Sequence, residues 1–294
     1  MRTFPADEIG VSSSLFPNAD GALVSAVEAA MAAGVSCITV DGFLAARDAE
    51  RAARLWCDAG GRTAAVSVRL EETGDPTSSD SSIAARGERR LARAVDLARL
   101  FRCRRIVLSG IMIDDPDGAW TASMGARLKE EGEAEWEAWR AELQERRRAV
   151  REDRIERLCR QLHRWAREQD GLAFALAPDT DPRALLGPEE IGWALSELPR
   201  VGFWHHTGAA AGLDWLGITP SASWLSGLSG SLCGVYLSDC QGVECELLPG
   251  AGAVPLSDWE TFRSPSLARI IKAEGPVPPW ALRQALAEVR DRLL

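Results

Sequence analysis

The sequence alternates between short apolar runs and longer amphipathic stretches. Runs rich in β-branched and aliphatic residues predict eight strands, over residues 8–14, 36–40, 64–70, 105–109, 171–177, 201–206, 234–239 and 268–274. Apolar positions at three- and four-residue spacing predict helices over residues 21–33, 44–58, 84–101, 188–198, 221–232, 258–262 and 279–293. The strands have no polar face, which is typical of a parallel sheet covered by helices.

Eight strand-helix units predict an α/β fold of the (β/α)8 TIM-barrel type, with a doubly wound open sheet as the alternative. The chain has 294 residues, a length that such barrels use as one domain. We therefore expect a single TIM-barrel domain over residues 1–294. The loops at the carboxyl ends of its strands are then the place to look for functional residues.

A long charged segment over residues 124–169 separates the fourth strand from the fifth. Its apolar positions keep mostly helical spacing among alternating Glu and Arg, at Trp136, Trp139, Leu143, Val150, Ile155, Leu158, Leu162 and Trp165. The pattern predicts one long amphipathic helix, or two helices in line. Such a helix either packs by one stripe with its charged face in solvent, or extends over the barrel mouth or toward a second subunit of a homo-oligomer.

Composition and charge exclude several classes of function. Lys and Arg number 34 against 43 Asp and Glu, a net charge of −9, which disfavours a nucleic-acid partner or an anionic membrane surface. No apolar run is long enough to span a membrane and no signal peptide is visible, so we expect a cytoplasmic protein. The seven scattered cysteines have no metal-binding spacing, and no phosphate-binding glycine loop predicts a nucleotide cofactor.

Several stretches together resemble the sugar phosphate isomerase/epimerase family, the xylose-isomerase-like TIM barrels. They are LARAVDLARLFRCRRIVLSG (91–110), WAREQDGLAFALAP (165–178), VGFWHHTGAA (201–210), GVYLSDCQG (234–242) and LPGAGAVPL (248–256). The last stretch is the most specific, because it resembles the family's LPGxGxV turn after the seventh strand. The resemblance spans nearly the whole chain and implies the same barrel that the strand count predicts.

The resemblance also implies a metal site, from which this chain departs. Family members hold one divalent ion with Glu, Asp, His and Glu on the fifth to eighth strands, and use the two glutamates for proton transfer beside a carbonyl. The matching positions here carry Ala177, His206 and Tyr236, and only Glu274 matches on the eighth strand. One carboxylate cannot offset the dehydration of a divalent ion. We therefore expect no metal and no other cofactor.

A rebuilt acid-base site around His206 is the catalytic hypothesis. His205 and His206 point to opposite faces of a strand, and the family register directs His206 into the barrel mouth. Glu274 or Asp239 would fix the His206 tautomer and raise its pKa. With Asp179 the same groups also suit a softer metal such as zinc. A polar cluster left over from an ancestral site is the competing interpretation.

Five further residues are candidates for contacting a ligand, and one of them is Asp179, which follows the fifth strand. Asp41 ends the second strand, where it either contacts substrate or begins a turn. Arg69 ends the third strand and suits a phosphate or carboxylate group. Trp204 suits stacking on a sugar ring or packing in the core. Tyr236, the single tyrosine of the chain, stands at the position of the family's histidine.

Three functions remain open from the sequence. The first is a divergent barrel that binds a small sugar, polyol or similar hydroxylated compound without the ancestral metal-dependent catalysis. The second is an active isomerase, epimerase or lyase with a site around His206, Asp239 and Glu274. The third is a non-catalytic partner protein that uses the long charged helix. We favour the first, because ligand positions are lost more easily than they are replaced.

Overall fold

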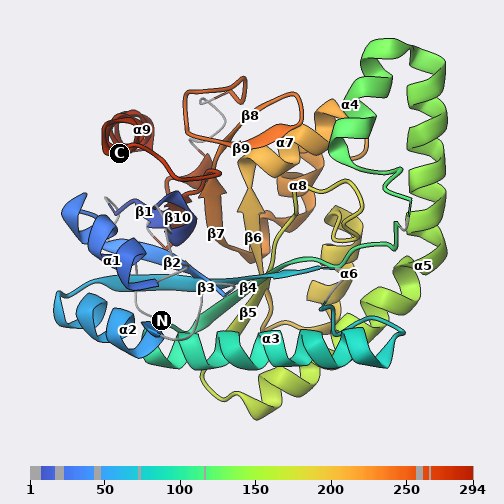
Figure 1. Cartoon of the computed structure of the whole chain (residues 1–294). Coiled ribbons are helices and arrows are strands. Elements are labelled where there is room, and N and C mark those ends of the chain that lie inside the picture. The colour runs from blue at the N-terminus through green and yellow to red at the C-terminus, as the bar shows by residue number, and fades with distance from the viewer. Residues whose placement is uncertain are drawn as a thin grey trace.

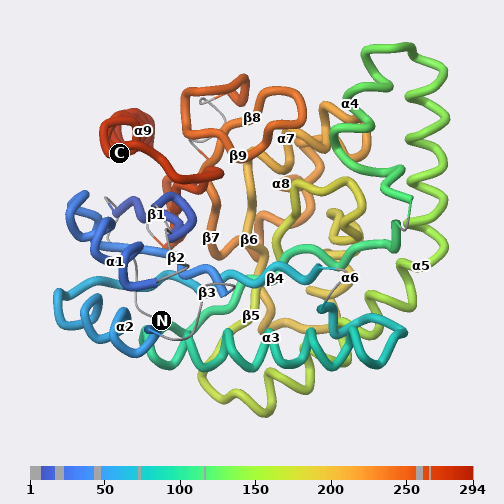
Figure 2. The backbone as a smooth tube through the Cα atoms, viewed as in Figure 1, coloured from blue at the N-terminus to red at the C-terminus, as the bar shows by residue number. Residues whose placement is uncertain are grey.

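The computed structural model of the chain describes residues 8–16, 23–42, 48–71, 74–115, 117–255, 261–264 and 266–293. Eight parallel strands close into a barrel with the helices outside it (Figures 1 and 2). The strands are β1 (Gly10–Ser12), β2 (Cys37–Asp41), β3 (Arg62–Leu70), β4 (Arg105–Gly110), β5 (Ala173–Leu176), β6 (Gly202–His206), β7 (Leu232–Leu237) and β10 (Ala268–Ile271). The predicted (β/α)8 barrel is confirmed, and the open sheet is excluded because β1 pairs with both β2 and β10.

Helices follow the strands and cover the outside of the barrel. They include α1 (Leu23–Ala32), α2 (Ala49–Asp58), α3 (Ser81–Leu100), α6 (Pro188–Glu197), α8 (Ser221–Leu228) and α9 (Pro279–Leu293). The beginnings of the first two predicted helices, at residues 21–22 and 44–47, and most of the helix predicted at 258–262 lie outside the described residues. No helix in the described part of the chain is long and apolar enough to cross a membrane.

The charged segment forms two helices that fold back on each other. Helix α4 (Ala122–Glu131) and helix α5 (Glu133–Glu168) lie side by side at one edge of the molecule, joined at Gly132 (Figures 1 and 2). The apolar positions from Trp136 to Trp165 all lie in the single 36-residue helix α5, so the prediction of one long helix is confirmed for them. The in-line alternative was wrong, because α4 reverses into α5 at Gly132. After the reversal the Trp139 ring packs against Gly125. The glycine is needed there, because a Cβ on Gly125 would lie only 2.6 Å from that ring. The Trp139 Nε1 also donates to the Ala119 carbonyl at 2.6 Å, which holds the hairpin at its base.

Two elements after β6 and β7 were not predicted. Helix α7 (Thr207–Trp215) begins directly after the last residue of β6. Strands β8 (Asp239–Gln241) and β9 (Glu244–Leu247) form a short antiparallel hairpin, with Gly242 in its turn at a φ of 64°. The strand predicted over residues 234–239 is thus divided, because β7 ends at Leu237. This hairpin brings a second set of side chains over the barrel mouth.

The lower part of the barrel is filled by apolar side chains. Trp204 is completely buried there, and Gly234 makes room for it, since a Cβ on Gly234 would lie 2.3 Å from the Trp204 ring. Small residues such as Ala65 and Ala175 and the larger Ile270 complete this layer. Because side chains alternate along a strand, the next inward positions lie one layer higher. Except for Ala177, these positions are polar, and they form the site described below.

Candidate functional site

A cavity of about 660 Å³ opens at the carboxyl ends of the barrel strands. Its walls come from strand ends and from the β8–β9 hairpin, and they include Ser14, Asp41, Ser67, Arg69, Ser109, Ala177, Asp179, His206, Tyr236, Glu246, Lys272 and Glu274. Ala177, His206, Tyr236 and Glu274, which the family register places at four successive strand ends, all line this one cavity. The walls carry both hydrogen-bond donors and acceptors, as a site for a hydroxylated molecule requires.

An ion pair between Lys272 and Glu246 lies in the cavity wall, and sequence reasoning missed both residues. Lys272 follows β10 directly and its amide donates to the Leu237 carbonyl at 3.1 Å, so the barrel ladder continues through it. Its Nζ lies 5.3 Å from the centroid of the Tyr236 ring. Burial alone would lower the pKa of Lys272 and raise that of Glu246, but the partner charge reverses both shifts. Both groups are therefore ionised in the folded protein.

His206 is buried beside this ion pair. Its ring lies edge-on to Tyr236, with centroids 5.5 Å apart. Burial and then the Lys272 ammonium lower the pKa of His206 to about 3. The expectation that Glu274 or Asp239 raises this pKa is wrong, because neither carboxylate is among the charges that act on the ring. The imidazole is neutral at physiological pH, and its Nε2 has no hydrogen-bond partner among the described residues.

His205 lies on the opposite face of β6, as strand alternation predicts. Its ring packs between Phe203 and Phe262, with centroid distances of 5.7 and 5.5 Å. It is outside the barrel and makes no part of the cavity wall that the described residues form. Burial lowers its pKa to about 3 as well. The two adjacent histidines therefore differ in environment but share a neutral state.

Asp239 does not reach the cavity, which corrects its assignment as a catalytic residue. Its buried carboxylate accepts backbone N–H bonds from Cys240 at 2.8 Å, Gly250 at 3.1 Å, Gly252 at 2.9 Å and Val254 at 2.8 Å. These bonds hold the turn that follows β9. The stretch that resembles the family's LPGxGxV turn is therefore a structural motif, whose backbone N–H groups bind the Asp239 carboxylate.

Replacing Asp239 by Ala should lower the free energy of unfolding by about 3 kcal/mol, because four backbone N–H groups lose a buried, charged acceptor at once. Asp239→Asn should cost less, since one amide oxygen still accepts. Urea unfolding followed by tryptophan fluorescence measures both changes. Glu274→Ala is the control, because Glu274 is exposed and should shift stability by no more than about 0.5 kcal/mol. A loss for Asp239→Ala as small as that of the control would contradict the assigned role.

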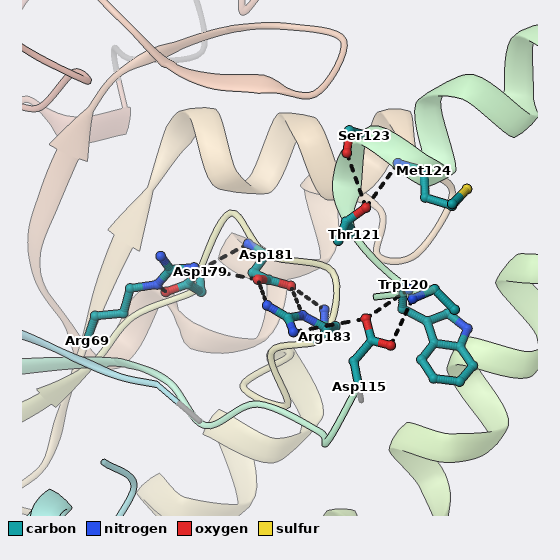
Figure 3. Close-up of polar contacts among 10 residues, drawn as sticks. Arg69, Asp115, Trp120, Thr121, Ser123, Met124, Asp179, Asp181 and Arg183 are labelled. Carbon is teal, nitrogen blue, oxygen red and sulfur yellow. Dashed lines mark hydrogen bonds and ion pairs between the residues drawn. The ribbon is translucent and has the colours of Figure 1, made fainter. Parts of the chain in front are cut away.

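Arg69 is already held by carboxylates (Figure 3). Its Nε and Nη2 donate to the two carboxylate oxygens of Asp179 at 3.0 and 2.8 Å, and Nη2 lies 3.7 Å from Asp181. A paired guanidinium of this kind offers little to a phosphate group. The interpretation of Arg69 as an anion site is therefore weakened, although both Arg69 and Asp179 line the cavity as expected of ligand-contacting residues.

The same row of charges continues to the base of helix α4 (Figure 3). Arg183 binds Asp181 with nitrogen–oxygen distances of 2.7 and 3.0 Å and lies 4.0 Å from Asp115. The Asp115 carboxylate accepts the backbone N–H of Trp120 at 3.0 Å. Thr121 follows and caps α4 by accepting the Met124 N–H. Ion pairs, and then the Trp120 N–H bond to Asp115, thus connect the cavity wall to the α4–α5 hairpin.

The remaining predicted residues occupy different depths. Asp41 lines the cavity, and its amide donates to the Ser13 hydroxyl at 3.0 Å. Tyr236 is buried in the wall, and burial raises its pKa to about 12. Trp204 lies below the cavity with its ring 5.3 Å from Tyr236, so it supports the floor and does not stack on a ligand. Glu274 stands at the rim, beyond the strand end that Lys272 occupies.

The family's divalent metal does not fit this site. Ala177, Tyr236 and the Lys272 ammonium stand at three of the strand ends, and a cation beside Lys272 would meet a like charge. Within the described ranges no three His, Cys, Asp or Glu side chains gather closely enough to hold a metal ion. The zinc alternative fails for the same reason, because Asp239 is used elsewhere and Asp179 binds Arg69.

Comparison with solved structures identifies the fold. A D-allulose 3-epimerase from Methylomonas sp. has 15% sequence identity and a TM-score of 0.66, over 100% of both chains. A D-tagatose 3-epimerase-like protein has 15% identity and a TM-score of 0.67, over 98% of this chain and 100% of the other. A xylose isomerase domain protein from Planctomyces limnophilus has 11% identity and a TM-score of 0.62, over 99% of this chain and 98% of the other.

The chain therefore has the xylose-isomerase-like TIM-barrel fold of sugar epimerases and isomerases. No protein-family model and no curated protein matches its sequence. Identities this low are consistent with the departures at the strand ends. They leave the function to be argued from the cavity itself.

Proposed function

We propose that the cavity binds a small, uncharged hydroxylated compound, such as a sugar or polyol, without the family's metal-dependent epimerisation. The observation that carries this proposal is the Lys272–Glu246 ion pair beside the neutral His206 and Tyr236. Three of the four metal-ligand positions carry Ala177, His206 and Tyr236, and a fixed cation stands at the barrel mouth, while the walls keep donors and acceptors for hydroxyl groups. A D-allulose 3-epimerase of the same fold has been solved in complex with D-allulose, which supports a sugar-sized ligand.

The charges of the wall favour an uncharged ligand over a phosphorylated one. Carboxylates outnumber cations among the residues that line the cavity. The cations are Arg69 and Lys272, and the carboxylates are Asp41, Glu71, Asp179, Asp181, Glu244, Glu246 and Glu274. Both cations are already paired with carboxylates. A phosphate group would enter a net negative cavity and would find no unpaired cation among the described residues of its wall, so its desolvation would go uncompensated.

Isothermal titration of the purified protein with D-allulose, xylitol and D-fructose 6-phosphate tests the proposal. We expect saturable binding of at least one uncharged compound, with affinity unchanged by EDTA, and at least about tenfold weaker binding of the phosphate ester, equivalent to about 1.4 kcal/mol. Ala177→Leu should weaken binding by placing a larger apolar side chain in the cavity wall, whereas Trp280→Ala, a change at an exposed tryptophan on α9, should not. Binding of the phosphate ester alone, or binding that EDTA removes, would overturn the proposal.

A second candidate is proton transfer by His206. The observation that favours it is the neutral imidazole in the cavity wall, with Nε2 free of hydrogen bonds among the described residues. A neutral imidazole can accept a proton, but a pKa of about 3 makes it a weak base, so its contribution should lie at or below the low end of the about 10²- to 10⁴-fold typical of general-base catalysis. Deuterium uptake at a carbon next to the carbonyl of bound D-allulose, followed by NMR in heavy water, would favour this candidate over simple binding. A non-catalytic partner protein stays a prediction from the charged helices alone.

A further inference from the structure

Two thiols lie against each other in the β8–β9 hairpin. The Sγ atoms of Cys240 and Cys245 are 3.3 Å apart, and both side chains are buried. Each sulfur also lies 3.2 Å from a carbonyl oxygen of the hairpin turn, Cys240 from Gly242 and Cys245 from Val243. The pair is close to the geometry of a disulfide, which needs an S–S distance of about 2.05 Å.

The hairpin register places this pair at a β-bulge. Asp239 pairs with Leu247, and Gln241 pairs with Glu244, with a register shift between the two. Two residues, Cys245 and Glu246, therefore oppose the single residue Cys240. Bulges re-aim side chains and are frequent beside functional sites. Here one bulge carries both a thiol of the pair and the carboxylate that binds Lys272.

Helix α7 leaves space for the sulfurs. A Cβ on Gly212 would lie 2.0 Å from the Cys245 Sγ and 3.5 Å from the Cys240 Sγ. A Cβ on Gly208 would lie 2.0 Å from the Cys245 carbonyl oxygen. Both glycines belong to GAAAG, a sequence motif that predicts nothing by itself. In the structure they allow the hairpin to pack directly on the helix. Cys245 lines the cavity and Cys240 does not, so a small molecule from the cavity reaches the Cys240 sulfur past that of Cys245, 3.3 Å away.

We propose that Cys240 and Cys245 are a redox site that a hydroperoxide converts reversibly into an intramolecular disulfide. The Cys240 thiolate attacks one peroxide oxygen, the O–O bond breaks, and a sulfenic acid and hydroxide form. The Cys245 sulfur then attacks the Cys240 sulfur, the S–S bond forms and the S–O bond breaks, and the departing hydroxide takes the Cys245 proton to leave as water. With hydrogen peroxide, two thiols and one peroxide give one disulfide and two waters.

The chemistry of the neighbouring groups sets the order of these steps. The contact with the Cys245 thiol lowers the pKa of Cys240, while the same contact raises the pKa of Cys245, so Cys240 ionises first. Burial raises the pKa of Cys37 to about 12 and that of Cys103 to about 11, so these thiols stay protonated. Because Glu246 directly follows Cys245, closing the disulfide also changes the position of the carboxylate that faces Lys272.

Non-reducing peptide mapping of peroxide-treated protein tests this proposal. The full chain is treated with hydrogen peroxide, denatured in the presence of N-ethylmaleimide, digested and examined by mass spectrometry. We expect the peptide that contains Cys240 and Cys245 to be two hydrogens lighter, with both sites unalkylated, and to be restored by dithiothreitol. Amide hydrogen exchange of the hairpin should slow in the oxidised protein, because the new bond restrains its opening.

Cys233 provides a matched control on the same tryptic peptide. Cys233→Ser should form the disulfide like the wild type, whereas Cys240→Ser and Cys245→Ser should each lose it. In Cys245→Ser a sulfenic acid should accumulate at Cys240, and dimedone would trap it. Full alkylation of all seven cysteines after peroxide treatment would overturn the proposal. Oxidation confined to the half-buried Cys57 and Cys159 would overturn it as well.

Discussion

Lys272→Met should lower the free energy of unfolding by about 3 kcal/mol at pH 7, because it leaves the Glu246 carboxylate largely buried without its cation. The side chains of the pair are only 20% and 24% exposed, so solvent can replace little of the lost interaction. Glu246→Gln should cost a similar amount, since it leaves the ammonium beside the Tyr236 ring without a counter-charge. Urea unfolding at equilibrium measures each variant.

The double variant Glu246→Gln/Lys272→Met separates the ion pair from its surroundings. If the pair acts as a unit, the double variant should recover most of the stability that either single change removes. Arg148→Met provides a matched comparison on the exposed face of α5, where Arg148 and Glu145 are 62% and 70% exposed. That change should cost less than about 0.5 kcal/mol. Losses that simply add in the double variant would show that the pair is not coupled.

Acidification from pH 7 to pH 5 should cost about 2 kcal/mol of stability for each of the buried histidines His205 and His206. The pKa of each is about 3 in the folded protein, against 6.5 for a histidine exposed to water. Between these two pKa values the unfolded chain binds more protons than the folded protein does. Stability therefore falls as the pH drops below about 6.5. Each pKa unit corresponds to about 1.4 kcal/mol. The slope of unfolding free energy against pH measures the effect.

His205→Phe tests this assignment without touching the cavity. Phenylalanine suits the space between Phe203 and Phe262 and takes up no proton. Because one of the two buried histidines is gone, the loss of stability between pH 7 and pH 5 that the histidines cause should be about half as large. The variant should then be more stable than the wild type at pH 5 by about 2 kcal/mol. His163→Gln, a change at an exposed position on α5, is the control and should leave the slope unchanged. Parallel pH profiles for wild type and His205→Phe would refute the assignment.

The sequence by itself determined the barrel and the direction of its strand residues. Eight apolar runs separated by amphipathic helices leave few ways to cover a parallel sheet, and they favoured the closed barrel over the doubly wound open sheet. The period of two along a strand put His205 and His206 on opposite faces, and the family resemblance indicated that His206 is the one that enters the barrel, as the structure shows. Lys272 lies two residues after the inward Ile270, so the same alternation contained a signal for it.

Only the tertiary structure decided which charged groups meet. The β8–β9 hairpin brings Glu246 to Lys272, and a short strand pair with a bulge has no periodic signal that predicts it. Asp239 looked catalytic from the resemblance, but long-range backbone N–H groups take up its carboxylate. The reversal at Gly132 likewise depends on packing between α4 and α5. Contacts between segments depend on how chain ends and loops are placed in space, whereas local periodicity reports only which face of an element is buried.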